Sequence, residues 1–275
     1  MDYFSHPAMS QSKLKDLKQS PKHFWTKHLS PERIIEEPTE AMQFGTLVHT
    51  CLFEHKKFLN NYIVMPKFDK RTKDGKAAHL DFVAKNADKI CIDEVDYNSA
   101  IAIRKAIFNK KTSSVLFSNS GLIEKELYWI DEITNIECKA KLDYFIEPCV
   151  KFPNGFIIDL KTTTNAYPEE FARSIYKYGY YNQLAFYCEG VRQIYKTQNY
   201  PDFIFTVIEK SQPYECSFLV GDENMFKIGL KENYKLLELY KHCVETNNWY
   251  GYEDKIQTIA LPAWAANKFF FEEQA

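Results

Sequence analysis

GFIIDLKTTT, Gly155 to Thr164, is the segment around which the rest of the chain is expected to be organised. Its apolar residues, Phe156 to Ile158, predict a buried strand, and the strand ends in Asp159 and Lys161. Because successive strand side chains point to opposite faces, these two charged side chains are expected to project together from one face. A lone D-x-K pattern is common in proteins. This one gains interest from a second carboxylate, Asp143, on the strand predicted just before it.

The composition is that of an ordinary folded protein. The chain has 275 residues, 45% of them hydrophobic and 26% charged, which is enough to bury a full core. Its seven cysteines are scattered without a C-x-x-C pair, which predicts reduced thiols, a cytoplasmic location and no metal held by sulfur. No apolar run is long enough for a membrane span and no signal-peptide pattern opens the chain, so no membrane partner is expected.

The net charge of −2 gives no indication of a polyanionic partner. Any surface for nucleic acid would therefore have to be a local patch. The best candidate is the basic segment PKFDKRTKDGK, residues 66–76, which includes Lys70, Arg71 and Lys73. From charge alone, a solvated surface loop is the simpler interpretation of this segment.

The hydrophobic pattern predicts one domain, residues 1–275, without repeats or linkers. It is expected to consist of an N-terminal helical part, residues 1–120, a core, residues 121–247, and a C-terminal tail, residues 248–275. In the core we expect a hairpin around a turn at 131–135, the 155–161 strand, a helix from Pro168 broken at Gly179, strands near 202–209 and 215–220, and a helix over 223–246. This order predicts an α/β fold with a mixed central sheet flanked by helices.

Asp143, Asp159 and Lys161 form the main candidate site. Two carboxylates from neighbouring strands can bind a divalent cation such as Mg²⁺. Such a cation polarises a phosphoryl oxygen and lowers the pKa of a bound water, and a nearby lysine can stabilise the developing charge. This is the chemistry of phosphodiester hydrolysis. The alternative is a salt bridge between a carboxylate and Lys161 at a strand end, which the spacing alone favours.

Other polar side chains have simple interpretations when each is taken alone. His49, in a predicted apolar helix, is typical of a satisfied core histidine. Tyr180, Gln183 and Tyr187 share one helix face, as packing residues do. Glu126, on the first strand of the hairpin, has the character of a solvated strand residue.

Taken in order, the motifs resemble those of PD-(D/E)xK nucleases. His49 in GTLVHTCLFE, Glu126 in EKELYW, Asp143 in CKAKLDYF, the IIDLKTT stretch and YGYYNQLAFY follow one another as in that superfamily. More narrowly, the chain looks like the RecE-type exonucleases of the exodeoxyribonuclease VIII family, which are often phage-derived. The opening SQSKLKDLKQSPKHFW, the basic DKRTKDGKA and the closing LPAWA are also similar to that family. The resemblance covers nearly the whole chain and implies a restriction-endonuclease-like fold.

The resemblance implies a metal centre. Asp143 and Asp159 would bind Mg²⁺, for which Mn²⁺ can substitute, with His49 and the backbone carbonyl of Leu160 as further ligands. Lys161 would be the catalytic lysine. Relatives with an iron–sulfur cluster have a cysteine where this chain has Ser20 and Pro21, so no cluster is expected.

The resemblance also implies residues around the metal. Glu126 would lie beside the metals, and Gln183 would contact the scissile strand or orient the lysine. Contacts with DNA are implied for two tyrosines and three basic residues: Tyr180, Tyr187, Lys70, Arg71 and Lys73.

The implied activity is processive 5′-to-3′ digestion of linear double-stranded DNA, leaving a 3′ single strand for an annealing protein in recombination. Such families often form rings around DNA, so a homo-oligomeric ring is a further expectation. Two alternatives stay open: a repair or defence nuclease of the same fold that acts on flaps or single strands, and a non-catalytic DNA-binding module. Intact Asp143, Asp159 and Lys161 count against the second.

Overall fold

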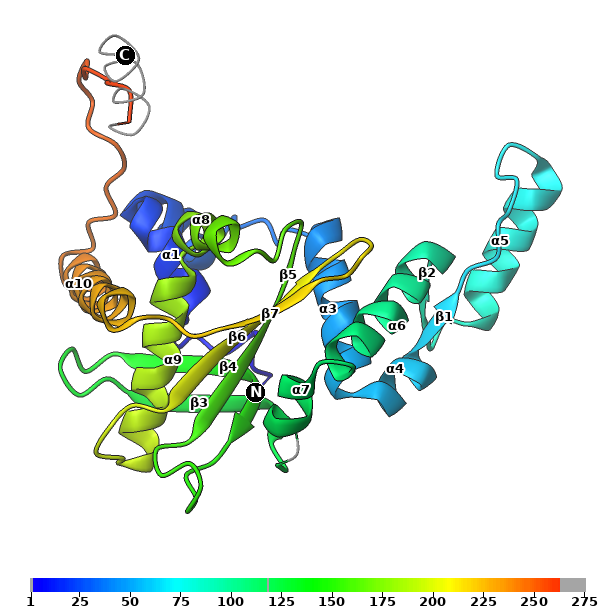
Figure 1. Cartoon of the computed structure of the whole chain (residues 1–275). Helices are drawn as coiled ribbons and strands as arrows, with labels where there is room; N and C mark the ends of the chain where they lie inside the picture. The colour runs from blue at the N-terminus through cyan, green and yellow to red at the C-terminus, as the bar shows by residue number, and fades with distance from the viewer. Residues whose placement is uncertain (1, 118, 263–275) are drawn as a thin grey trace, which may run out of the picture.

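The computed structural model describes residues 2–117 and 119–262. A five-stranded mixed sheet in the order β3-β4-β5-β6-β7 forms its centre, green and yellow in Figure 1. The strands are β3 (Leu122–Ile130), β4 (Glu137–Ile146), β5 (Phe156–Thr163), β6 (Asp202–Glu209) and β7 (Cys216–Leu219). β5 and β6 run parallel, and the other neighbouring pairs run antiparallel. The predicted mixed α/β fold is confirmed.

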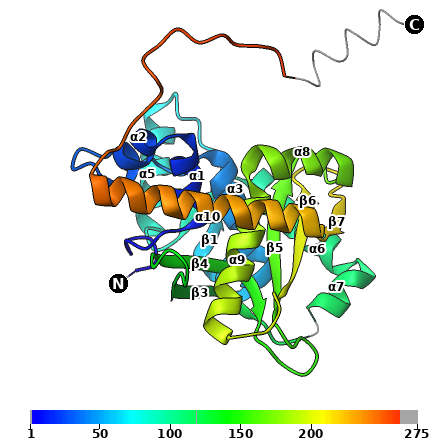
Figure 2. The same ribbon diagram turned by 90° about the vertical axis from the view of Figure 1, so that its left-hand side faces the viewer.

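Helices cover both faces of the sheet (Figures 1 and 2). The helices that follow or precede the sheet strands are α1 (Gln11–Gln19), α2 (Pro21–Phe24), the π-helix η1 (Trp25–Leu29), α3 (Glu40–Phe53), α4 (His55–Asn61), α6 (Glu94–Phe108), α7 (Lys111–Leu116), α8 (Pro168–Tyr178), α9 (Tyr180–Tyr195) and α10 (Glu223–Thr246). α9, α10 and α1 enclose the larger hydrophobic core on one face, and α3 and α6 enclose a second core on the other. Figure 2 shows α10 lying across α9.

Strand β5 is buried on both faces. Ile157 belongs to the core under α9, whereas Leu160 packs with Leu47 of α3 in the second core. A strand with a parallel neighbour and helices on both sides is expected to be apolar throughout, which explains the Phe156–Leu160 run interrupted only by Asp159. A single charged residue in such a surrounding is costly unless it is paired.

The connection from β5 to β6 consists of α8 and α9, broken at Gly179 as predicted. Gly179 has a left-handed φ of +72°, which glycine adopts without the steric penalty of a side chain, and its N–H donates to the Tyr176 carbonyl at 3.3 Å. The break lets α9 leave the direction of α8 and pack against β3, β4 and β6. Gln183, in the first turn of α9, is thereby held over the sheet.

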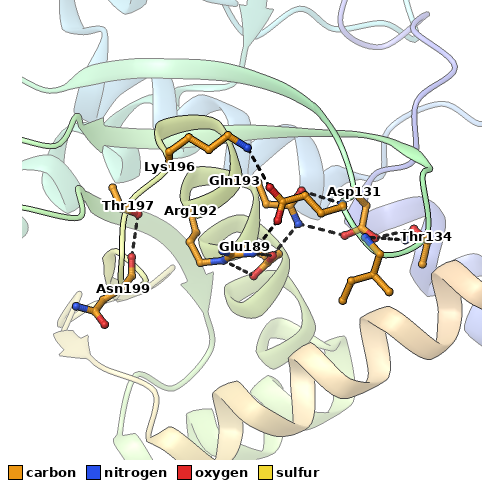
Figure 3. A network of polar contacts seen from close by, with 10 residues as sticks. Asp131, Thr134, Glu189, Arg192, Gln193, Lys196, Thr197 and Asn199 are labelled. Atoms are coloured by element: carbon orange, nitrogen blue, oxygen red, sulfur yellow. Dashed lines mark hydrogen bonds and ion pairs between the residues drawn. The ribbon is translucent and has the colours of Figure 1, made fainter.

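A polar network fixes the β3–β4 hairpin against α9 (Figure 3). Gln193 of α9 donates to Asp131 in the hairpin turn at 3.3 Å and to Glu189 at 2.7 Å. Arg192 contacts the same Glu189 carboxylate at 2.6 Å, and Asp131 also accepts from the Thr134 hydroxyl at 2.7 Å. Both strands of the hairpin are therefore held at a fixed position relative to α9.

Strands β4 and β5 separate partway along their length. Their pairing covers only Tyr144 to Ile146 of β4. Beyond it, the N-terminal segment takes the place of β5 beside β4: Met9 N–H donates to the Glu137 carbonyl at 2.8 Å, and Lys139 N–H donates to the Met9 carbonyl at 2.7 Å. The two strands thus open into a fork whose branch point lies at Asp143 and Asp159.

An arm projects from the body beyond α4 and α6, at the right of Figure 1. It consists of β1 (Tyr62–Val64) and β2 (Ile90–Ile92), which pair in parallel, and α5 (Lys73–Lys85) between them. The basic segment 66–76 is therefore not a loop throughout, because Thr72 caps a helix that starts at Lys73. This helix, which the sequence pattern did not predict, buries none of its residues.

The last described residues, 248–262, contain neither helix nor strand. Across residues 2–117 and 119–262, no helix combines the length and the apolar character that a membrane crossing requires.

Candidate active site

Asp159 and Lys161 project from the same face of β5, as the strand period predicts. Lys161 Nζ lies 2.5 Å from Asp159 Oδ2. Asp159 is only 1% exposed, so its carboxylate depends on this lysine and on neighbouring groups rather than on water. The salt bridge weighed as an alternative is thus present, and it lies in a cleft together with other side chains that can bind a metal.

The fork between β4 and β5 positions Asp143. Where the ladder with β4 has ended, the Leu160 N–H donates to Asp143 Oδ2 at 2.8 Å. The carboxylate replaces a backbone acceptor at this point, which satisfies a buried donor. Its other oxygen, Oδ1, is left to face His49.

His49, Glu124 and Asp143 form a group that could hold a metal ion. Their ligand atoms all lie within 4.8 Å of one another. His49 Nε2 is 3.1 Å from Glu124 Oε1 and 3.6 Å from Asp143 Oδ1. A six-coordinate divalent ion with bonds of about 2.1 Å puts neighbouring ligand atoms about 3.0 Å apart, close to these separations.

The hydrogen bonding of His49 fits this interpretation. Its Nε2 atom is buried and makes no hydrogen bond of acceptable geometry, although two carboxylates lie nearby. A buried nitrogen without a hydrogen bond is costly in a native protein. A cation between the imidazole and the carboxylates would remove that cost, so the residues present fit a divalent metal.

Each acidic group of the site has a basic neighbour. Lys141 Nζ contacts the second oxygen of Glu124, and Lys161 contacts Asp159. Burial raises the pKa of Asp159, Lys161 opposes that rise and Asp143 adds to it. Burial would lower the pKa of Lys161, but the carboxylates of Asp159 and Asp143 outweigh it and its pKa is raised. The positively charged form of Lys161 is therefore favoured beside these two carboxylates.

Helix α9 contributes two of the predicted residues to the site. Gln183 Nε2 donates to Asp159 Oδ1 at 3.0 Å, so it orients the carboxylate and not the lysine. Lys161 Nζ lies 4.7 Å from the centre of the Tyr180 ring, a cation–π arrangement. Tyr187, one turn further on from Gln183, packs against the larger core, where burial raises the pKa of its hydroxyl.

Glu126 lies outside the group formed by His49, Glu124 and Asp143. It is exposed on β3 and accepts a hydrogen bond from Tyr128 at 3.1 Å, and Glu124 stands next to His49 in its place. Glu124 has a left-handed φ of +54°, and the β3–β4 ladder skips its pairing with Asp143. In the observed register Ile130 pairs with Glu137, which brings Glu124 opposite Asp143. A turn of residues 131–135 alone would put Leu142 there, so the predicted turn does not identify Glu124.

The basic residues of segment 66–76 lie on the arm, away from this group (Figure 1). Arg71 is already engaged within the segment: its Nε and Nη2 atoms donate to Asp69 at 2.9 and 3.2 Å. Lys70 and Lys73 are exposed beside it. None of these three basic side chains lines the cleft that contains the candidate metal group.

The site opens into a cleft between α3 and β5. Gly45 and Thr46 of α3, Thr162 to Thr164 at the end of β5, and Lys210 line it together with the residues above. Its volume of about 860 Å³ lies within the range of about 300–1,000 Å³ that encloses a small-molecule ligand.

Comparison with known proteins places this geometry in a family. A search of curated proteins finds no significant match. Among solved structures, the chain is similar to a protein from Eubacterium rectale with a provisional exonuclease assignment, at 15% identity and a TM-score of 0.57, covering 94% of this chain and 92% of that one. SSO0001 matches at 15% identity over 72% of this chain and 86% of its own, with a TM-score of 0.29 that is too low for any argument. The first likeness concerns the fold. The family model of a PDDEXK-like domain of unknown function, DUF3799, matches residues 10–262, and the chain belongs to that family.

Proposed function

We propose that this chain is a divalent-metal-dependent deoxyribonuclease. The single observation that carries the proposal is the group His49, Glu124 and Asp143, with a buried imidazole nitrogen that lacks a hydrogen bond, next to the Asp159–Lys161 pair. Membership of a PDDEXK-like family supports a nuclease built on these residues. A protein that only binds DNA has no need of three carboxylates and a lysine converging in one cleft.

The proposed metal is Mg²⁺, with Mn²⁺ as a substitute. Asp143 Oδ1, His49 and Glu124 would hold it, and Asp159 and the Leu160 carbonyl are further ligands. When bound, the ion supplies Lewis acidity and a water of lowered pKa. The Lys161 ammonium, now paired with Asp159, stabilises charge that develops on the phosphoryl oxygens, and the Gln183 amide keeps Asp159 in its orientation.

The proposed substrate is linear double-stranded DNA, digested from 5′ to 3′ so that a 3′ single strand is left for an annealing partner. The resemblance to RecE-type exonucleases supports this activity, and so does the exonuclease assignment of the Eubacterium rectale protein. In this proposal residues 1–275 act as one domain with its catalytic core at 121–247, in recombination, in the cytoplasm, and in a homo-oligomeric ring.

A second candidate is a nuclease that acts on flaps or single strands. The volume of the cleft, about 860 Å³, favours it because it suits one strand. The two candidates differ in the end that they attack: the first starts at a duplex end, whereas the second needs an unpaired strand.

The test is digestion of linear and covalently closed double-stranded DNA by the purified protein, with Mg²⁺ or with EDTA. We expect Mg²⁺-dependent release of nucleotides from linear DNA alone. Lys161→Ala is expected to lower the rate by about 10²–10³-fold with DNA binding retained, as for loss of one charge-stabilising group. Lys85→Ala is the matched control, because Lys85 is an exposed lysine on the arm that pairs with Asp81.

Other outcomes separate the alternatives. A label on the 5′ end of one strand gives the polarity. Cutting of closed circles would indicate an endonuclease, and preference for flaps would favour the second candidate. Binding without cleavage of any DNA, in Mg²⁺ and in Mn²⁺, would refute the proposal in favour of a non-catalytic module.

A further inference from the structure

Phe4 presents its ring at the edge of the cleft. It is one of the residues that line the cleft, yet 77% of its surface is exposed. The ring meets Tyr3 edge to face, with centroids 5.5 Å apart, and most of its surface remains open to solvent. It is therefore available to a ligand.

The ring is held in place rather than left on a frayed end. Lys139, on β4, donates through Nζ to the carbonyls of Tyr3 and His6 at 2.5 and 2.7 Å. The Phe4 N–H donates to Asp2 Oδ2 at 3.1 Å, which closes a turn around the ring. Together with the pairing of Met9 beside β4, these bonds fix the N-terminal segment across the hairpin.

A cation accompanies the ring. Lys141 Nζ lies 5.3 Å from the centre of the Phe4 ring, and the same ammonium contacts Glu124 of the candidate metal group. An aromatic face and a cation side by side match the two parts of a nucleotide, its base and its phosphate. The contact of Lys141 with Glu124 puts this nucleotide next to the phosphate that would be cut.

We propose that Phe4 stacks on an unpaired base of the DNA strand whose neighbouring phosphate lies at His49, Glu124 and Asp143, with Lys141 on the backbone. The inference rests on the proposed function and specifies the form of its substrate. Inside a duplex each base is covered on both faces by its neighbours, so an internal base can stack on a side chain only after it has left the helix. The inference therefore requires that the end of the strand in the cleft is unpaired, whether it was single from the start or separates from a duplex end on binding.

The test measures binding of short single-stranded oligonucleotides to the Lys161→Ala protein, with a fluorophore at the end far from the cleft. An abasic residue is moved through successive positions from the free end. We expect one position at which the missing base weakens binding by about tenfold, the size of one base–aromatic stacking interaction. Phe4→Ala should weaken binding of the intact oligonucleotide by the same factor and abolish the sensitivity to that position.

Two further variants make the result specific. Phe4→Trp keeps an aromatic face and should restore both the affinity and the sensitive position. Tyr252→Ala removes another exposed ring, 73% exposed and outside the lining of the cleft, and should change neither. An unchanged abasic profile in Phe4→Ala would overturn the inference while leaving the nuclease proposal intact. Absence of binding to any DNA would overturn both.

Discussion

Substitution of Glu124 is the sharpest test of the metal group, because Glu126 two residues away is a matched control. Glu124→Gln keeps the size of the side chain and removes its charge next to His49 Nε2, 3.1 Å away. Glu126→Gln makes the same chemical change at an exposed position, where the side chain accepts a hydrogen bond from the hydroxyl of Tyr128. The structure predicts a loss of metal affinity in the first variant alone.

The magnitude follows from the site. Two unit charges about 4 Å apart interact by about 4 kcal/mol at an effective dielectric constant of about 20. The side chain of Glu124 is 32% exposed, so solvent screens part of this interaction energy. The amide oxygen of the introduced glutamine can still bind the metal. Lys141 loses its carboxylate partner and then repels the cation. We expect a net loss of about 2 kcal/mol, or about 30-fold in the dissociation constant for the metal.

The assay is titration of the metal-free protein with Mn²⁺, with the free ion followed by electron paramagnetic resonance. It needs no DNA and no turnover, so an error about the substrate does not disturb it. Glu126→Gln should bind within about twofold of the wild type, as expected for a surface change. Equal losses in the two variants, or a larger loss for Glu126→Gln, would refute the assignment of Glu124 as a ligand.

Three further predictions concern neighbouring features. Gln183→Leu, which frees Asp159, should lower nuclease activity by about 10–100-fold while the thermal midpoint changes little, as loss of an orienting partner does. Glu189→Gln should lower the free energy of unfolding, measured in urea titrations, by about 2 kcal/mol. This is less than the loss expected on breaking a fully buried ion pair, because the side chain of Arg192 is 29% exposed. Burial raises the pKa of Glu189, but hydrogen bonds from Arg192 and other groups outweigh burial, so the pKa lies below 4.5. The extra stability of the wild type over Glu189→Gln should therefore be lost as the pH falls below 4.5. Neutralising Lys70, Arg71 and Lys73 should weaken DNA binding and flatten its salt dependence, and an unchanged slope measured by anisotropy would remove these residues from the DNA interface.

Local periodicity predicted most of the sheet and its helices. The turn at 131–135, the break at Gly179 and the shared face of Asp159 and Lys161 all depend on neighbours in sequence, and each is found in the structure. Helix α5 was missed because it has no buried face, and hence no apolar stripe to detect.

The position of Glu124 beside His49, in place of the predicted Glu126, depends on long-range geometry. Glu126 was assigned from the order of the motifs. Glu124 reaches His49 because its backbone has a left-handed φ and because β4 and β5 separate at this point. Neither feature can be recognised in the hydrophobic pattern. Proximity of His49, on a helix far back in the chain, likewise depends on how α3 packs on the sheet.

The bond between Leu160 N–H and Asp143 bears on how an inactive form of this protein should be made. One oxygen of Asp143 serves the backbone of β5, and the other faces the candidate metal group. Asp143→Ala would therefore leave a backbone donor without its partner, at a cost of about 1–3 kcal/mol, and its loss of activity could come from a damaged strand. Asp143→Asn keeps a carbonyl oxygen for the amide, and Lys161→Ala leaves the fork untouched. A trap that binds DNA without cutting it is best built on these two substitutions.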